Sequence, residues 1–113
     1  MPKQKILITG GVGMIGKALI RILYRDYYLI VLDKKSQIKR NKTYIKSFKN
    51  NGVDFYSIDI LQKKKLNKYF KNIEYVIHLA AMLGVSQTEK KKYNCWRVNF
   101  TGTKNVVEAS ELN

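Results

Sequence analysis

A glycine-rich turn between a short apolar run and an amphipathic stretch is the feature that most constrains this fold. The run Ile6–Ile8 lacks polar alternation, which is typical of a strand buried on both faces of a parallel sheet. It stops at Gly10, and from Met14 to about Arg25 the apolar residues recur at helical spacing in one stripe: Ile15, Ala18, Leu19, Ile22 and Leu23. The sequence therefore predicts a strand, a tight turn and a helix in direct succession.

The rest of the chain repeats this alternation. Apolar segments at Tyr28–Leu32, Val53–Ile58 and Glu74–Ala80 predict three more strands, and residues 34–52 predict loop and a weakly marked helix. Two further helical faces follow, one with Leu61, Leu66, Tyr69, Phe70 and Ile73, the other with Val98, Val106 and Ala109 between Trp96 and about Leu112. Strands separated by helical segments predict right-handed crossovers and a doubly wound parallel α/β sheet of the Rossmann type, as one domain over residues 1–113.

The composition is that of a globular domain and excludes several other classes. The chain has 113 residues, 45% of them hydrophobic. No apolar run approaches the roughly 20 residues that a membrane helix needs. Its one cysteine, Cys95, cannot form an internal disulfide, which fits a reducing compartment. We therefore expect a cytoplasmic protein without a membrane partner.

The net charge of +14, from 22 basic and 8 acidic residues, has two explanations. Dense positive charge attracts nucleic-acid phosphates by counterion release. However, the lysines are scattered over separate segments, and residues with A/T-rich codons are abundant throughout, which favours the base composition of the genome as the cause. We therefore expect weak binding to polyanions at low salt and no specific nucleic-acid partner.

The glycine turn has the spacing of a dinucleotide-binding loop. Gly10 permits a tight turn, Gly13 lets the backbone approach a pyrophosphate, and Gly16 allows the helix to pack closely on the strand. The free amides at the start of the helix, at Met14 and Ile15, would face the phosphates because that helix end carries partial positive charge.

Asp33 ends the second strand, near the distance of about 20 residues beyond the glycines that is expected of a ribose-binding carboxylate. A carboxylate accepts hydrogen bonds from both ribose hydroxyls and repels a 2′-phosphate, which favours NAD over NADP. Lys34 and Lys35 beside it would favour the phosphate, so this alternative stays open. A solvated loop carboxylate is the other reading of a lone Asp.

These residues and three later motifs resemble the extended short-chain dehydrogenase/reductase family, specifically its NAD-dependent sugar-nucleotide epimerases and dehydratases. Thr9–Gly16 matches the family's TGGxGxxG turn. The other matches are the pair Asp59-Ile60, the run His78-Leu79-Ala80-Ala81 and the Asn-x-x-Gly-Thr-x-Asn motif from Asn99 to Asn105. The four motifs stand in the family's order and cover nearly the whole chain.

The resemblance also implies roles for individual residues. Asp59 would meet the adenine amino group, and Ile60 would pack on the adenine ring. The small residues Leu79, Ala80 and Ala81 would line the nicotinamide side of the cofactor, and Asn99 would lie beside it. His78 is treated by the family motif as structural, so we expect a buried, hydrogen-bonded histidine and no catalytic base.

The catalytic Tyr-x-x-x-Lys pair of the family is not found in this sequence. Tyr93 has Arg97 at that spacing, but it precedes the Asn99 motif, whereas the family's pair follows it. We therefore expect no catalytic residue and no metal site here. By family order, the catalytic pair and the substrate domain would follow residue 113.

The resemblance therefore implies the amino-terminal cofactor part of an enzyme that transiently oxidises a nucleotide sugar, inactive as this chain alone and homodimeric at full length. Two alternatives remain, a non-catalytic NAD-binding or regulatory module and part of an extended-family ketone reductase. If the sheet stops after its fourth βα unit, the fourth strand should have an open edge and the helices should expose apolar surface.

Overall fold

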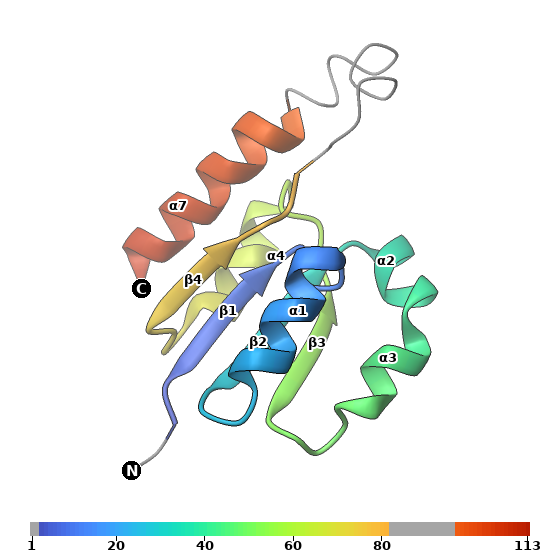
Figure 1. Cartoon of the computed structure of the whole chain (residues 1–113). Coiled ribbons are helices and arrows are strands. Elements are labelled where there is room, and N and C mark those ends of the chain that lie inside the picture. Colours follow the sequence, from blue (N-terminus) through green and yellow to red (C-terminus); the bar gives the residue numbers. More distant parts are fainter. Residues whose placement is uncertain (1–2, 82–96) are drawn as a thin grey trace.

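The computed structural model describes residues 3–81 and 97–113, which form a parallel sheet with helices on both faces (Figure 1). The sheet has four strands in the order β3-β2-β1-β4, with every pair parallel. Their bounds are Lys5–Thr9 for β1, Tyr28–Asp33 for β2, Val53–Ser57 for β3 and Tyr75–His78 for β4. This order is that of the first four strands of a doubly wound sheet, so the predicted fold class is confirmed.

Helices and turns connect the strands as predicted, with differences in length. The predicted helix after β1 is α1, and residues 34–52 contain two short helices where one was expected. The bounds are Met14–Leu23 for α1, Lys35–Arg40 for α2, Lys42–Ser47 for α3, Lys63–Asn67 for α4 and Thr103–Leu112 for α7. A 3-10 turn, Lys68–Phe70, continues α4, and a π-helical turn, Arg97–Gly102, leads into α7. The predicted helix start at Trp96 lies outside the described residues.

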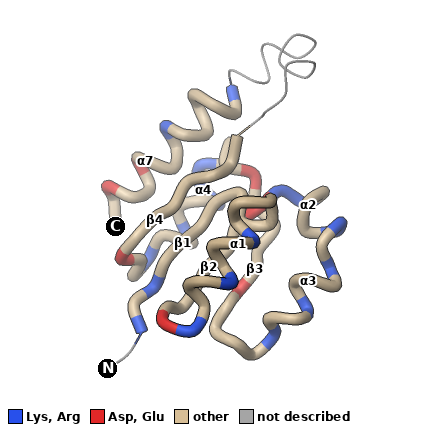
Figure 2. The backbone as a smooth tube through the Cα atoms, viewed as in Figure 1, with Lys and Arg blue, Asp and Glu red and all other residues tan. Residues whose placement is uncertain are grey.

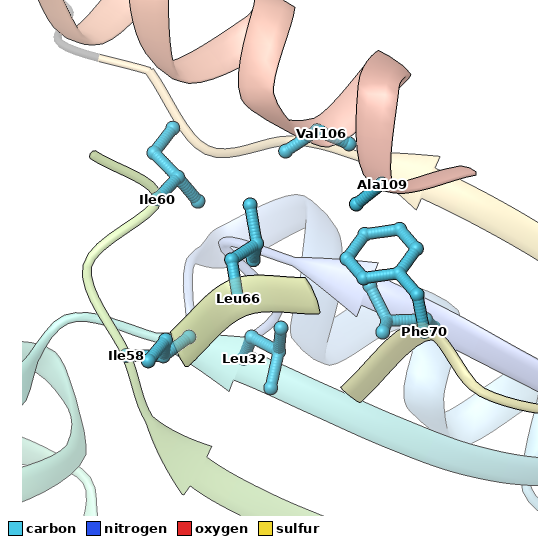
Figure 3. Packing of buried hydrophobic residues seen from close by; sticks show 8 residues of the cluster. Leu32, Ile58, Ile60, Leu66, Phe70, Val106 and Ala109 are labelled. Atoms are coloured by element: carbon cyan, nitrogen blue, oxygen red, sulfur yellow. The ribbon is translucent and has the colours of Figure 1, made fainter. Parts of the chain in front are cut away.

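Two hydrophobic clusters cover the two faces of the sheet, because successive residues of a strand point to opposite sides. On β1, Leu7 joins the cluster under α4 and α7, whereas Ile6 and Ile8 join the cluster under α1 and α3. Figure 3 shows the first cluster, where Leu66 and Phe70 from the predicted third helical face meet α7. Its buried members are Leu7, Leu32, Ile58, Ile60, Leu66, Phe70, Val106 and Ala109.

The predicted apolar stripe of α1 is buried only in part: Leu23 packs against the cluster under α1 and Leu19 is half-buried. Ile15 and Ile22 are 64% and 70% exposed, and the buried residues of this helix are Gly16 and Ile20. The physical reason is the glycine: Gly16 lies against the backbone of Gly11, and this close approach turns the face with Gly16 and Ile20 toward the sheet. An apolar stripe therefore stays on the outer side of α1.

The open edge expected at β4 is present in the described part of the chain, where β4 pairs only with β1. Tyr75 on that strand is about half exposed. In the same described residues, no helix is long and apolar enough to cross a membrane. Basic residues are spread over α1, α2, α3 and α4 (Figure 2), which agrees with the scattered pattern of the sequence.

Candidate dinucleotide-binding site

A cleft of about 450 Å³ lies at the carboxyl ends of the strands. In a doubly wound sheet this is the place where the connections from neighbouring strands leave toward opposite faces, and where ligands bind. The volume lies in the range of small-molecule pockets. The lining comes from the glycine turn, from the ends of β2, β3 and β4, and from one residue each of α2 and the π-helical turn: Gly10, Gly13, Leu32, Asp33, Lys34, Gln37, Ile58, Asp59, Ile60, Leu61, Leu79, Ala80, Ala81 and Val98.

Gly10 is required at its position for two reasons. Its φ is +67°, a conformation that favours glycine. A Cβ there would also stand 2.7 Å from the amide nitrogen of Ala80, beyond the end of β4. The residue thus lets the turn after β1 pass directly beside the segment that follows β4, which brings two walls of the cleft together.

Gly13 and the start of α1 form the anion-facing part of the turn. Gly13 precedes the helix in an extended conformation, and a Cβ there would meet only the Gly10 carbonyl oxygen, at 3.5 Å. No side chain caps this helix end, and the first-turn amides of Met14 and Ile15 have no acceptor within the helix. Gly16 packs closely as predicted, although its partner is the turn residue Gly11.

Asp33 is held rigidly at the end of β2. Its side chain is part of a residue only 8% exposed, so it is not the solvated loop carboxylate of the alternative reading. The Val12 amide donates to Oδ2 at 3.0 Å, and the Lys34 amide donates to Oδ1 at 2.8 Å. Because an ionised carboxylate has about four acceptor positions, two stay available toward the cleft that Asp33 lines.

Asp59 and Ile60 follow β3 and occupy different environments. Asp59 lines the cleft, and its Oδ1 accepts a hydrogen bond from the Leu61 amide at 2.9 Å. Ile60 also reaches the cleft, but it is only 6% exposed and belongs to the core under α7 (Figure 3). Its side chain packs against Gly102, so the face predicted to cover an adenine ring is largely used by the core.

The segment after β4 is fixed by a side chain of β1. The buried Thr9 hydroxyl oxygen accepts hydrogen bonds from the amides of Leu79 at 3.1 Å and Ala80 at 3.2 Å. The Leu79 amide also donates to the Thr9 carbonyl oxygen at 3.0 Å, and β4 ends at His78, before the predicted end at Ala80. His78 is hydrogen-bonded on both ring nitrogens, as predicted, although it is half-buried where a buried ring was expected.

The structure does not bring every predicted residue into the cleft. Among the predicted cofactor residues, Met14, Ile15 and Gly16 stand beside it on α1 and do not line it. Asn99 is exposed on the π-helical turn, where its neighbour Val98 lines the cleft instead.

Two residues of the last motif, Thr103 and Asn105, have roles that the sequence reasoning missed. Thr103 bonds to His78, and the Asn105 amide group donates to the Ile60 carbonyl oxygen at 2.9 Å. Their inclusion in the Asn-x-x-Gly-Thr-x-Asn motif was the available signal. In the described residues no cluster of His, Cys, Asp and Glu could hold a metal ion, and Cys95 and Tyr93 lie outside them.

Comparison with known proteins agrees with this geometry. The model of the NAD dependent epimerase/dehydratase family matches residues 6–113. The chain therefore belongs to the NAD-dependent epimerase/dehydratase family, and its sheet is the dinucleotide-binding type of fold found in that family.

Individual relatives cover nearly all of this chain but share only part of their own length with it. The UDP-N-acetylglucosamine 4,6-dehydratase (inverting) of Campylobacter jejuni is 30% identical over 108 residues, which is 94% of this chain and 32% of the relative. The chain thus spans about a third of the length of this curated relative.

Solved structures show the same relation. The X-ray structure of Pen from Bacillus thuringiensis superposes with a TM-score of 0.86 at 27% identity, covering 96% of this chain and 34% of the other. UDP-glucose 4-epimerase from Brucella ovis, in complex with NAD, gives a TM-score of 0.75 at 25% identity, covering 96% of this chain and 32% of that one.

Proposed function

We propose that this chain is the NAD-binding portion of an enzyme that acts on a nucleotide sugar. The observation that carries the proposal is the position of the Asp33 carboxylate, held by two backbone amides at the edge of a cleft whose other side is the open turn at Gly13. Carboxylate and glycine turn are the two groups that a dinucleotide needs, one for a ribose and one for the pyrophosphate.

The residues present fit the adenosine half of NAD. The two remaining acceptor positions of Asp33 would take the two ribose hydroxyls, and the Met14 and Ile15 amides would face the pyrophosphate. The Asp59 carboxylate would accept a hydrogen bond from the adenine amino group. A 2′-phosphate would meet the Asp33 carboxylate, which the Val12 and Lys34 amides hold in place, although Lys34 also lines the cleft and would attract the phosphate.

Leu79, Ala80 and Ala81 would line the path toward the nicotinamide. The wall is small and apolar, so it would exclude water without offering groups that react. Bound NAD supplies the acceptor for a hydride from a sugar carbon. Since the Campylobacter jejuni relative is named for a UDP-sugar dehydratase and the Brucella ovis neighbour for a UDP-sugar epimerase, we assign a nucleotide sugar as the substrate class of the whole enzyme.

Calorimetric titration of the 113-residue chain with NAD and NADP tests the proposal. We expect binding of NAD, weaker binding of NADP, and loss of this preference in Asp33→Asn. Asp54→Asn is the matched control, since Asp54 is an exposed carboxylate on β3 away from the lining. A folded chain that binds neither nucleotide, or binds NADP more tightly than NAD, would overturn the proposal.

A further inference from the structure

A chain of hydrogen bonds runs from α7 through β4 to β1 and ends in the wall of the cleft. The Thr9 hydroxyl oxygen lies 2.5 Å from His78 Nδ1, and His78 Nε2 lies 2.9 Å from the Thr103 hydroxyl oxygen. The same Thr9 oxygen accepts from the amides of Leu79 and Ala80. Thr103 itself does not line the cleft, so the histidine connects a distant helix to the site.

The direction of each bond follows from the number of donors and acceptors. A hydroxyl has one proton to donate and two lone pairs to accept with. The Thr9 hydroxyl oxygen accepts from two backbone amides, that of Ala80 and that of Leu79, and it shares the Leu79 amide with the Thr9 carbonyl oxygen at 3.0 Å. With these two donors on its lone pairs, the hydroxyl directs its proton to His78 Nδ1, which must be unprotonated. The ring proton of the neutral imidazole is therefore on Nε2 and is donated to Thr103.

Protonation of Nδ1 would break this arrangement. A proton on that nitrogen would face a hydroxyl that already accepts from two amides, so either the ring or one of these amides would have to move. The Leu79 amide could keep the Thr9 carbonyl oxygen as its acceptor, so the Ala80 amide is the one that would be displaced first. Both amides belong to residues of the cleft wall.

We propose that His78 is a positioning residue of the cofactor site: as the neutral tautomer with its proton on Nε2, it fixes the Thr9 hydroxyl, and through it the Leu79–Ala81 wall, in the form that accepts NAD. The inference rests on the proposed function, because it assigns a consequence for NAD affinity to a network outside the cleft.

The surroundings of the imidazole support a neutral ring. Burial lowers the pKa of His78 below its ordinary value of 6.5, and no charged group of the described residues contributes to this shift. Glu108 lies on α7, the helix that carries Thr103, and it forms ion pairs with Lys63 and Lys104. The other charged residues on elements packed against β4 are Lys5 on β1, Arg97 on the π-helical turn and Glu111 on α7.

Nitrogen NMR of the imidazole tests the network directly. The chain contains a single histidine, so its ring signals need no assignment. We expect an unprotonated Nδ1 and a protonated Nε2 near neutral pH, with or without NAD. The opposite tautomer, or rapid exchange between the two, would overturn the proposal whatever the chain binds.

Nucleotide titrations of two variants test the consequence for the site. An asparagine carbonyl can take the place of Nδ1 as an acceptor, and it does not titrate, whereas a longer glutamine amide reaches the position of Nε2. We therefore expect His78→Asn to keep NAD affinity at low pH better than His78→Gln does. The native chain should lose roughly three- to tenfold in NAD affinity between about pH 7.5 and about pH 5.5, the change that corresponds to one hydrogen bond.

Thr9→Ser and Thr9→Val form a matched pair that does not alter the histidine. The serine variant keeps the hydroxyl and should bind NAD like the native chain, while the valine variant should bind several-fold more weakly at every pH. If the native chain binds NAD with an affinity that is the same at both pH values and in all variants, the role of His78 is refuted and the proposed function stands. If the native chain binds no NAD, the proposed function fails and this role fails with it.

Discussion

Asn105, near the start of α7, donates a hydrogen bond from its side-chain nitrogen to the carbonyl oxygen of Ile60, 45 residues earlier in the chain, at 2.9 Å. Both residues are buried, at 7% and 6% exposure. The bond satisfies a backbone carbonyl in the loop between β3 and α4, which is also a wall of the candidate dinucleotide site. The start of α7 is therefore bonded to the loop after β3 through Asn105 and to the end of β4 through Thr103.

Replacement of this asparagine should destabilise the fold. In Asn105→Ala the Ile60 carbonyl oxygen keeps its burial and loses its donor, so we expect a loss of about 1–3 kcal/mol in the free energy of unfolding, measured with urea. Asn113→Ala is the control, since that asparagine also bonds to a backbone carbonyl, of Ala109, but at the exposed end of α7. Its effect should stay within about 0.5 kcal/mol. Equal losses in the two variants would contradict the structural role of Asn105.

Replacement by alanine should lower the stability of the chain at Gly16 and its NAD affinity at Gly13. In Gly16→Ala the Cβ would collide with the Gly11 backbone, which cannot yield cheaply, so we expect a loss of about 1–3 kcal/mol in stability. In Gly13→Ala the Cβ finds only ordinary contact and the backbone is already extended, so stability should be unchanged while NAD affinity falls at least tenfold. Urea unfolding and calorimetry on both variants separate the two effects.

The stability of the chain should depend on pH through His78. Because burial lowers the pKa of this ring in the folded state, the unfolded chain binds a proton more readily than the folded chain. Stability therefore rises with pH in this window: it is fully present above the ordinary value of about 6.5 and is lost as the pH falls toward the lower pKa of the folded state. Urea midpoints between about pH 7.5 and about pH 5.5 should show the decline, and His78→Asn should remove that share of it.

The ion pair between α4 and α7 should contribute little, and only at low salt. Lys63 Nζ lies 2.6 Å from Glu108 Oε2, and Lys63 lowers the pKa of Glu108, yet the Lys63 and Glu108 side chains are 52% and 33% exposed. We expect Glu108→Gln to lower the urea midpoint slightly, with the difference vanishing in about 1 M salt, where charges are screened within about 3 Å. Glu111→Gln on the same helix is the control for the charge change. A large, salt-independent decrease of the urea midpoint in Glu108→Gln would contradict this prediction.

Much of the fold follows from local pattern. Apolar segments predicted all four strands to within two residues at each end, and the runs of β1 and β2 lack polar alternation because these inner strands of a parallel sheet are covered on both faces. Asp54 and Ser57 interrupt the segment of β3, whose residues are mostly exposed. The strand end at His78 was missed, because Leu79 and Ala80 continue the apolar run in the sequence beyond it. The buried face of α1 was predicted only in part, because the close approach of Gly16 sets the orientation of the helix and a pattern of hydrophobic residues does not include glycine.

Part of the candidate site could likewise be predicted from the sequence, and part could not. The glycine turn and Asp33 stand next to strand ends in the sequence, so their meeting at one edge of the sheet could be predicted from the order of elements. The partners of Ile60 and His78 could not, because Asn105 and Thr103 reach them across long stretches of chain where no periodicity links the residues. Because Ile60 is buried beneath α7, less of its side chain is left to contact an adenine ring than the motif alone suggests.

The place of β1 between β2 and β4 has a consequence for biosynthesis. β2 follows β1 closely and can pair with it as soon as both have emerged from the ribosome, but β4 is made only after two further helical connections. Until then the second side of β1 offers free amide and carbonyl groups to any other strand, and non-local pairing of this kind is slow. Gly10 and Ala80, which touch in the finished fold, can meet only at that late stage. Nucleotide present during translation would therefore find no complete site until β4 has docked.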